Sequence, residues 1–475
     1  MKAIKYFFAG ALMSVFSVSA MAQATVDDAV KAIKSGAPNV AQVIKEVQKA
    51  NKKNPDALVQ IGRAYLDVKD TLNTKKFADL ADAASKHKSA AAFILLGDLA
   101  VIQDDGGKAA EAYQQAIYAD KMNPTGYIKY ANIYRGKSPE MAVETLEQMR
   151  QNCPDQPVDA YAAHIYYLSA KQNAKYMPMA LESFQKADRS KLDKNQLTEF
   201  ALTAFASQKN QLSLDIVENA LRMEPRNAGF NRLAMYNCVE LKEFDNALKY
   251  ADALFNKSDS AEFTSNDYKY AALAHTGVKN HEEAINQYKK QLTVVEGDAQ
   301  ATVHKSISDS YRELGDMDNA LAHYEKFLNT NSKTSANDWA GFGNIYRMMA
   351  AEQTGAEQEA LVNKAVEIYQ SLIQKFPKAA DDYANFMSAR TIQILDADQK
   401  KGLAVPYYQA LFTSISSASK MDNTDKTRLM EACQYLGIYY FKIKDDSATA
   451  KPYFEKLQEI DPENALAKQV LEIIK

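Results

Sequence analysis

The sequence predicts an all-α protein in which helical hairpins repeat and stack into a right-handed superhelix. Glycine (17) and proline (12) together make about 6% of the 475 residues, against about 12% in average usage, so turns are few. Apolar residues recur at helical spacing in units of about thirty-four residues, which is the length of two helices and a short turn. With 47% hydrophobic residues, each hairpin has an apolar face to bury against its neighbours.

Charge and cysteine content exclude several classes of protein. The 57 basic and 60 acidic residues nearly cancel, so nothing indicates a nucleic-acid partner. The three cysteines Cys153, Cys238 and Cys433 are widely separated and lack the paired spacing of a metal site or a disulfide framework. We expect them to be small buried hydrophobic residues.

Residues 1–22 have the order of a cleavable signal peptide. Two lysines precede an apolar stretch over 6–18, and a small-residue motif ends at Ala22, which predicts cleavage before Gln23. No later stretch has 18 consecutive apolar residues, so no membrane-spanning segment is expected. No cysteine follows the cleavage point to carry a lipid anchor. The expected localisation is therefore periplasmic or secreted.

The clearest repeat unit covers 301–334. Its first helix has apolar and small residues on one face, Leu314-Gly315-Asp316 predicts a tight turn, and a second apolar face follows. The residues on these two faces are Ile307, Ser308, Tyr311, Ala320, Tyr324 and Phe327.

This unit resembles the tetratricopeptide repeat, in which large residues occupy positions 4, 7, 11 and 24 and small residues positions 8, 20 and 27. The small residues let the two helices touch. A second unit starts at Lys194 and ends at the proline that usually closes a repeat, with Leu197, Phe200, Ala201, Ser213, Val217, Ala220 and Pro225 in the matching positions. Weaker copies extend the resemblance over nearly all of the chain after residue 54.

The resemblance implies about ten or eleven hairpins over 55–462, preceded by capping helices within 23–54. About ten extra residues around 352–362 are expected to lengthen one hairpin. A capping helix is expected over 463–475, with Asp461 as its N-cap and Pro462 in its first position.

In three segments, polar residues replace the regularly spaced apolar residues: 188–195, 256–266 and 413–425. Each is either a hinge or an ordinary long loop.

Enzyme motifs are incomplete in this sequence. His281-Glu282-Glu283 lacks the second histidine of a zinc-protease helix, and Gly341-Phe342-Gly343 lacks the lysine of a phosphate-binding loop. We therefore expect no enzymatic activity, no metal and no cofactor.

The resemblance implies a scaffold that holds a protein or peptide segment in a groove lined by the first helices. Some repeats of this type clamp a C-terminal carboxylate with lysine and asparagine, but Lys305 is followed by Asp309 instead of asparagine. The predicted groove has an apolar centre and polar flanks, and that centre is either an exposed partner site or core. The candidate residues are Asn132, Arg135, Leu202, Phe205, Met235, Leu273, Lys305, Asp309, Arg312, Asn344 and Arg347.

Two functions remain open. The leading one is a non-enzymatic periplasmic scaffold or adaptor in envelope assembly, secretion or stress response. The alternative is a carbohydrate-binding accessory protein of the cell envelope, because the 27 tyrosines offer rings that stack on sugars. The absent lipid-anchor cysteine counts against this alternative. Most of the tyrosines also fit the large-residue position of the first helices, as Tyr65, Tyr134, Tyr311, Tyr346 and Tyr440 do.

Overall fold

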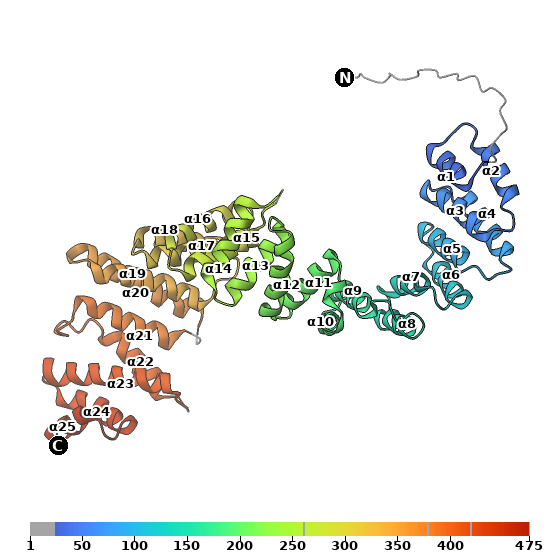
Figure 1. Ribbon diagram of the computed structural model, residues 1–475. Helices are drawn as coiled ribbons and strands as arrows, with labels where there is room; N and C mark the ends of the chain where they lie inside the picture. Colours follow the sequence, from blue (N-terminus) through green and yellow to red (C-terminus); the bar gives the residue numbers. More distant parts are fainter. Residues whose placement is uncertain (1–23, 260–261, 378–379, 419, 475) are drawn as a thin grey trace. The chain divides into compact units, whose positions relative to one another are not determined.

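The computed structural model describes residues 24–259, 262–377, 380–418 and 420–474, and these residues form helices and short turns without a strand (Figure 1). The predicted signal peptide over 1–22 lies outside the described residues. The all-α prediction is confirmed for the described part of the chain.

The chain divides into two compact units, Met1–Ala220 and Leu221–Lys475. The division falls within α12 and not in any of the three candidate hinge segments, whose mobility remains a prediction. The helices that begin in the first unit are α1 (Val26–Ser35), α2 (Val40–Ala50), α3 (Pro55–Asp67), α4 (Thr71–Ala84), α5 (Ala90–Ile102), α6 (Gly106–Ala119), α7 (Pro124–Tyr134), α8 (Pro139–Asn152), α9 (Val158–Ala170), α10 (Tyr176–Lys186), the 3-10 turn η1 (Arg189–Lys191), α11 (Lys194–Ala206) and α12 (Asn210–Met223).

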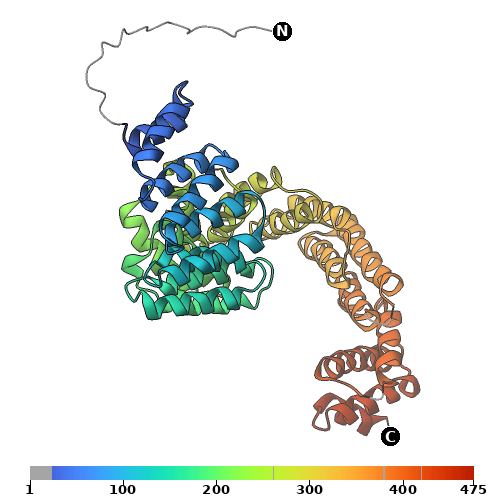
Figure 2. The same ribbon diagram turned by 90° about the vertical axis from the view of Figure 1, so that its right-hand side faces the viewer.

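The second unit continues the same order of hairpins, which can be followed by colour in Figure 2. Its helices are α13 (Ala228–Glu240), α14 (Phe244–Asp252), η2 (Ala253–Lys257), α15 (Ser265–Gly277), α16 (His281–Leu292), α17 (Asp298–Glu313), α18 (Met317–Thr330), α19 (Ala336–Glu352), α20 (Gly355–Lys375), α21 (Asp381–Ile392), η3 (Gln393–Leu395), α22 (Val405–Ser416), α23 (Asn423–Ile438), η4 (Tyr439–Ile443), α24 (Ser447–Ile460) and α25 (Ala465–Ile473).

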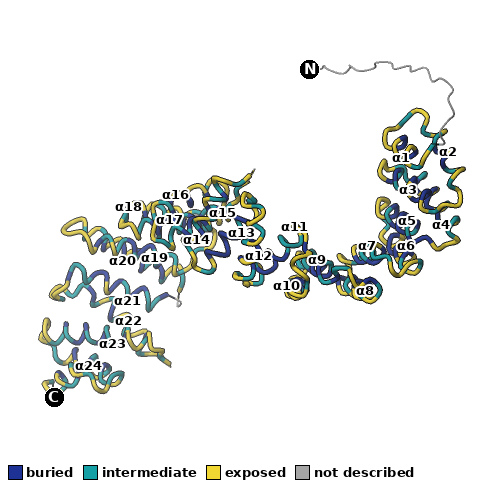
Figure 3. Tube along the Cα trace, in the orientation of Figure 1, coloured by how far each residue is buried: buried dark blue, intermediate teal, exposed yellow. Residues whose placement is uncertain are grey.

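From α3 to α24 the described helices form eleven successive first-and-second-helix pairs, which confirms the predicted ten or eleven hairpins. The first helix of a hairpin also contacts the first helix of the next hairpin. Examples are α3 with α5 and α13 with α15. Buried residues alternate with exposed ones along each helix, and the turns are largely exposed (Figure 3). Each hairpin therefore buries its apolar face against its neighbours.

One turn geometry recurs between first and second helices. Lys69, Lys279 and Gly315 all adopt left-handed backbone angles, with φ between 61° and 76°. The residue that follows is an Asp or Asn whose side chain caps the second helix, as Asp316 does by accepting from the Asn319 amide at 3.1 Å. The backbone reverses within three residues, which explains the low glycine and proline content.

Glycines of the first helices allow the close approach that the repeat pattern predicted. A Cβ on Gly97 would lie 2.3 Å from the Tyr113 ring, and one on Gly437 would lie 2.7 Å from the Phe454 ring. The second helix therefore packs its aromatic ring directly on the backbone of the first.

The predicted lengthening around 352–362 is confirmed, because α19 and α20 have 17 and 21 residues. The predicted start of the last helix is wrong. Asn464 is the N-cap of α25 and accepts from the Ala467 amide at 3.1 Å, whereas Asp461 ends α24. Asp461 instead accepts a hydrogen bond from the Asn464 side chain, so it supports the cap from one turn earlier.

All three cysteines are free and buried, as predicted. Burial raises the pKa of Cys433 to about 12. Across the described ranges, none of the helices has both the length and the apolar content needed to cross a bilayer. Within the same ranges, no three side chains of the metal-binding types gather into one group.

Candidate functional site

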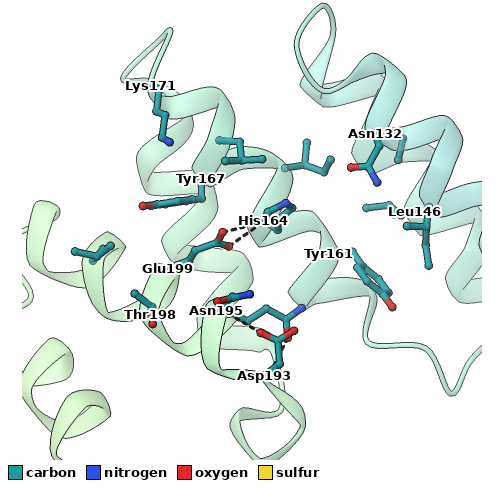
Figure 4. Close-up of a pocket in the computed structure, with 16 residues that line it drawn as sticks. Asn132, Leu146, Tyr161, His164, Tyr167, Lys171, Asp193, Asn195, Thr198 and Glu199 are labelled. Atoms are coloured by element: carbon teal, nitrogen blue, oxygen red, sulfur yellow. Dashed lines mark hydrogen bonds and ion pairs between the residues drawn. The ribbon is translucent and has the colours of Figure 1, made fainter. Parts of the chain in front are cut away.

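A cavity of about 610 Å³ opens in the first unit among α7, α8, α9 and α11 (Figure 4). Three of these, α7, α9 and α11, are first helices of consecutive hairpins, and α8 contributes Leu146 to the lining. We call it the first-helix cavity. Its position is the one that the repeat pattern predicts for a groove.

Strong helix starts fix the cavity's walls. Pro124 occupies the first position of α7, where its missing N–H costs no hydrogen bond. At α11, Asp193 and Gln196 form a capping box: the Asp193 carboxylate accepts from the Gln196 amide at 2.9 Å, and the Gln196 side chain accepts from the Asp193 amide at 3.0 Å. Both residues line the cavity, so its rim is held rigidly.

His164 and Glu199 face each other across the cavity, from α9 and α11 (Figure 4). His164 Nδ1 lies 2.8 Å from one carboxylate oxygen of Glu199 and 3.0 Å from the other. Because an ionised carboxylate only accepts, Nδ1 carries the proton of this bond. When the His164 ring is neutral, its Nε2 is an acceptor. The His164–Glu199 pair then offers a ligand both this nitrogen and the carboxylate oxygens as acceptors.

Aromatic and apolar side chains surround this pair. Tyr161 and Tyr167 line the cavity and are half-buried, while Leu146 is fully buried. Burial, followed by the nearby charge of Glu199, raises the pKa of Tyr167, so this hydroxyl is neutral and can donate. The Lys171 ammonium lies 5.9 Å from the centre of the Tyr167 ring. The cavity can therefore hold an apolar side chain and bond its polar backbone at the same time.

Of the predicted groove residues, Asn132 and Leu202 line the first-helix cavity. Leu202 is 38% exposed, so a partner can reach it. Arg135 is exposed at the end of α7 and Phe205 is half-buried on α11, but neither is among the residues that line the cavity.

The prediction that Met235 faces an open groove is wrong. Its side chain is fully buried, because α13 packs against α14 and α15 and buries nearly all of its faces. Leu273 is half-buried on α15. The predicted central stripe therefore contains at least one core residue.

The polar candidates of the second unit interact within the protein. The Lys305 ammonium lies 2.6 Å from the Asp338 carboxylate, and Arg312 pairs with Asp309 at 3.0 Å. Asn344 accepts a hydrogen bond from the Tyr369 hydroxyl at 2.8 Å. Burial raises the pKa of Asp309 despite the two neighbouring cations.

Arg347 is half-buried, and its Nε has no hydrogen-bond partner among the described atoms. Whether any of these polar candidates binds a partner remains a prediction.

Sequence reasoning missed His164, Glu199, Tyr161 and Tyr167. The α9–α10 hairpin was missed because its turn, 171–175, is longer than the three-residue turn of most hairpins and shifts the register. One signal was present, since counting one period on from Tyr127 reaches Tyr161.

The profile of the tetratricopeptide repeat family matches residues 306–334, which include the second half of α17 and all of α18. These residues therefore match one tetratricopeptide repeat. The eleven hairpins of the described residues extend this repeat well beyond the matched stretch. No curated protein sequence is similar enough to match this chain.

Several solved structures are similar to it. The C-terminal part of a TPR repeat-containing protein from Cytophaga hutchinsonii is 20% identical, with 58% of this chain and 99% of that chain covered and a TM-score of 0.47. The Cut9–Hcn1 complex of the APC/C is 14% identical over 94% of this chain and 96% of that chain, with a TM-score of 0.29. A pilF protein from Pseudomonas aeruginosa is 15% identical, covering 50% and 90% of the two chains with a TM-score of 0.27.

Proposed function

We propose that this tetratricopeptide repeat protein is a non-enzymatic scaffold that binds a protein or peptide segment in the first-helix cavity. The observation that carries the proposal is the 610 Å³ cavity formed by three consecutive first helices. Repeats of this type generally serve as protein-interaction scaffolds. A peptide segment has alternating apolar and polar groups, and the cavity offers matching partners for both.

The chemistry of the lining supports an extended segment. Asn132 and Asn195 carry amide groups that both donate and accept, which suits a peptide backbone. Leu146 and Leu202 provide apolar surface for a side chain of the partner, which gains roughly 1.5 to 3 kcal/mol when it is fully buried. Apolar contact is therefore expected to supply most of the affinity.

Photo-crosslinking in cells tests this proposal. A photoreactive amino acid at Asn132 or Leu202 should yield the same discrete crosslinked protein, identified by mass spectrometry. The control position is Tyr118 on α6, which is 64% exposed and does not line the cavity. Equal crosslinking from all three positions, or no discrete product from Asn132 and Leu202, would contradict the proposal.

We further propose that the protein acts in the periplasm or outside the cell, in envelope assembly, secretion or stress response. The signal-peptide pattern before Gln23 supports this localisation. The intact mass of the protein from the envelope fraction should correspond to a chain that begins at Gln23. A mass that includes Met1, or incorporation of labelled fatty acid, would contradict it.

A further inference from the structure

A second cavity, of about 490 Å³, lies in the second unit among α14, α15 and α16. The end of α14 continues as the π-helical segment η2, a wider helical turn that is often found at functional sites. Two of the helices around this cavity, α14 and α16, are second helices of their hairpins, whereas first helices dominate the first-helix cavity. We call it the second-helix cavity.

Three aromatic rings form one wall of the second-helix cavity. Phe255 stacks on Tyr268 with ring centres 5.6 Å apart, and Phe263 meets Phe255 edge-on at 4.9 Å. All three side chains are half-buried, so each ring keeps part of its surface in contact with the cavity or with solvent. Such rings form an apolar platform on which the C–H groups of a ligand can pack.

Planar polar side chains also line the second-helix cavity, and they are held in place by their own hydrogen bonds. Asn256 Nδ2 donates to Asp252 Oδ1 at 2.8 Å, and Gln287 Nε2 donates to Glu283 Oε1 at 2.9 Å. Gln287 is buried, and its Oε1 has no hydrogen-bond partner among the described atoms. These four side chains supply donors and acceptors at fixed positions.

The charges of these two carboxylates are already balanced. Lys257 pairs with Asp252, and hydrogen bonds from Lys257 and then Asn256 lower the pKa of that carboxyl. The pKa of Glu283 is also lowered, chiefly by a hydrogen bond from Asn286, with Gln287 and the nearby His275 and Lys290 contributing less. Both carboxylates are therefore ionised and each has a cation nearby.

This balance restricts the ligand. Because each carboxylate already has a cation beside it, neither a cationic nor an anionic ligand would meet an unpaired opposite charge there. A purely apolar ligand would cover the polar side chains of the cavity and leave their unpaired atoms without hydrogen bonds, which is costly. A neutral ring with several hydroxyl groups and an apolar C–H face needs no counter-charge and can hydrogen-bond to the polar side chains.

We propose that the second-helix cavity binds a neutral sugar ring, with its C–H face on the aromatic platform of Phe255, Phe263 and Tyr268. The hydroxyl groups of the sugar bond to the amides and carboxylates that line the same cavity. The volume lies within the range of about 300 to 1,000 Å³ that is usual for ligand pockets. The site is separate from the first-helix cavity, so the protein carries a sugar site in addition to its peptide groove.

Ligand-observed saturation-transfer NMR on the purified full chain tests this proposal. The probes are the methyl glycosides of glucose, galactose, mannose, xylose and N-acetylglucosamine, with arginine amide as the cationic comparison. We expect transfer to at least one glycoside and none to arginine amide. No transfer to any glycoside, or transfer to arginine amide alone, would overturn the proposal.

Two variants test whether the glycoside binds in the second-helix cavity. Phe263→Ala removes one ring of the platform and should weaken glycoside binding at least tenfold. Asn256→Ala changes an exposed side chain and should weaken it severalfold without affecting the fold. Tyr118→Ala, an exposed aromatic position of the first unit, is the matched control and should bind as the unchanged protein does. Unchanged affinity in both Phe263→Ala and Asn256→Ala would show that the sugar binds elsewhere.

Discussion

The guanidinium of Arg232 on α13 holds the carboxylate of Asp267 in the first turn of α15. Arg232 Nε lies 2.6 Å from Asp267 Oδ1, and Nη2 lies 2.9 Å from Oδ2. The Asp267 side chain is fully buried and also accepts from the Tyr236 hydroxyl at 2.7 Å and the Thr264 amide at 2.7 Å. One carboxylate thus joins two successive first helices and caps the second of them.

The same relationship recurs along the array at a spacing of about one repeat. Arg63 pairs with Asp98 and Lys305 with Asp338, in each case from one first helix to the next. His164 and Glu199, 35 residues apart, make the equivalent contact at the first-helix cavity. These inter-repeat pairs supplement the apolar contacts between hairpins and help to set the register in which they stack.

Replacing Arg232 by methionine should destabilise the protein. The change leaves the Asp267 carboxylate buried without its cation, and breaking a buried pair in this way costs about 3 to 5 kcal/mol. Because part of the Arg232 side chain is exposed, we expect about 2 to 4 kcal/mol. Urea unfolding followed by circular dichroism measures the loss.

An exposed pair provides the control for this prediction. Lys75 and Asp79 lie one turn apart on α4 with more than half of each side chain exposed, so Lys75→Met should change stability by less than about 0.5 kcal/mol. Equal unfolding midpoints for the two variants would show that the Arg232–Asp267 pair contributes little.

The hairpins could be predicted from the sequence because burial imposes a period on residue type. Ile307, Ala320 and Phe327 are buried as their repeat positions require. The first-helix cavity could not be predicted in the same way. Its central contact joins His164 and Glu199 across two helices, and neither a histidine nor a glutamate is specific to a repeat position.

Met235 shows where the repeat pattern misleads. Its position ordinarily faces a groove, but α13 is apolar on several faces and its neighbours cover them. Position in the repeat thus predicts which face a residue occupies, whereas the surrounding helices decide whether that face is open. The α9–α10 hairpin was missed for a different reason, since two extra turn residues interrupt the count.

Gly97→Ala should destabilise the α5–α6 hairpin. The added methyl group would meet the Tyr113 ring, which is almost fully buried and cannot move aside freely. Overpacking of this kind costs about 1 to 3 kcal/mol. Gly106 is the control, because nothing lies within 4 Å of a Cβ there, and Gly106→Ala should stay within about 0.5 kcal/mol of the unchanged protein. Thermal unfolding that is the same for both variants would contradict the close approach.

Met235→Ser and Leu202→Ser should have opposite consequences. Serine at the fully buried Met235 leaves a cavity and an unpaired hydroxyl, and we expect a loss of about 3 kcal/mol or more. Leu202 is 38% exposed, so serine there should change stability by less than about 1 kcal/mol while weakening the crosslink made from Asn132. Thermal unfolding and crosslink yield separate the two effects. A stable Met235→Ser variant would restore this residue as a groove candidate.

Two histidines make the α17–α18 hairpin sensitive to acid. His304 Nδ1 and His323 Nδ1 lie 3.0 Å apart, so one neutral ring donates its proton to the other, and a second proton between them would set two donors against each other. Burial, followed by Lys326, His304 and Lys289, lowers the pKa of His323 to about 4. Burial and then Lys326 also lower the pKa of His304.

The folded protein therefore binds fewer protons than the unfolded chain over this range. The contribution of the pair to stability is complete above a pH of about 6.5, the value of an unperturbed histidine, and is lost as the pH falls towards about 4. Because both rings remain partly in contact with water, we expect a loss of about 1 to 2 kcal/mol between pH 7.5 and 4.5. His323→Gln should remove most of this loss. His87→Gln, at a side chain that is 77% exposed, should retain it. Urea midpoints at the two pH values measure the difference, and a His323→Gln variant as acid-sensitive as the unchanged protein would rule out the histidine pair as its cause.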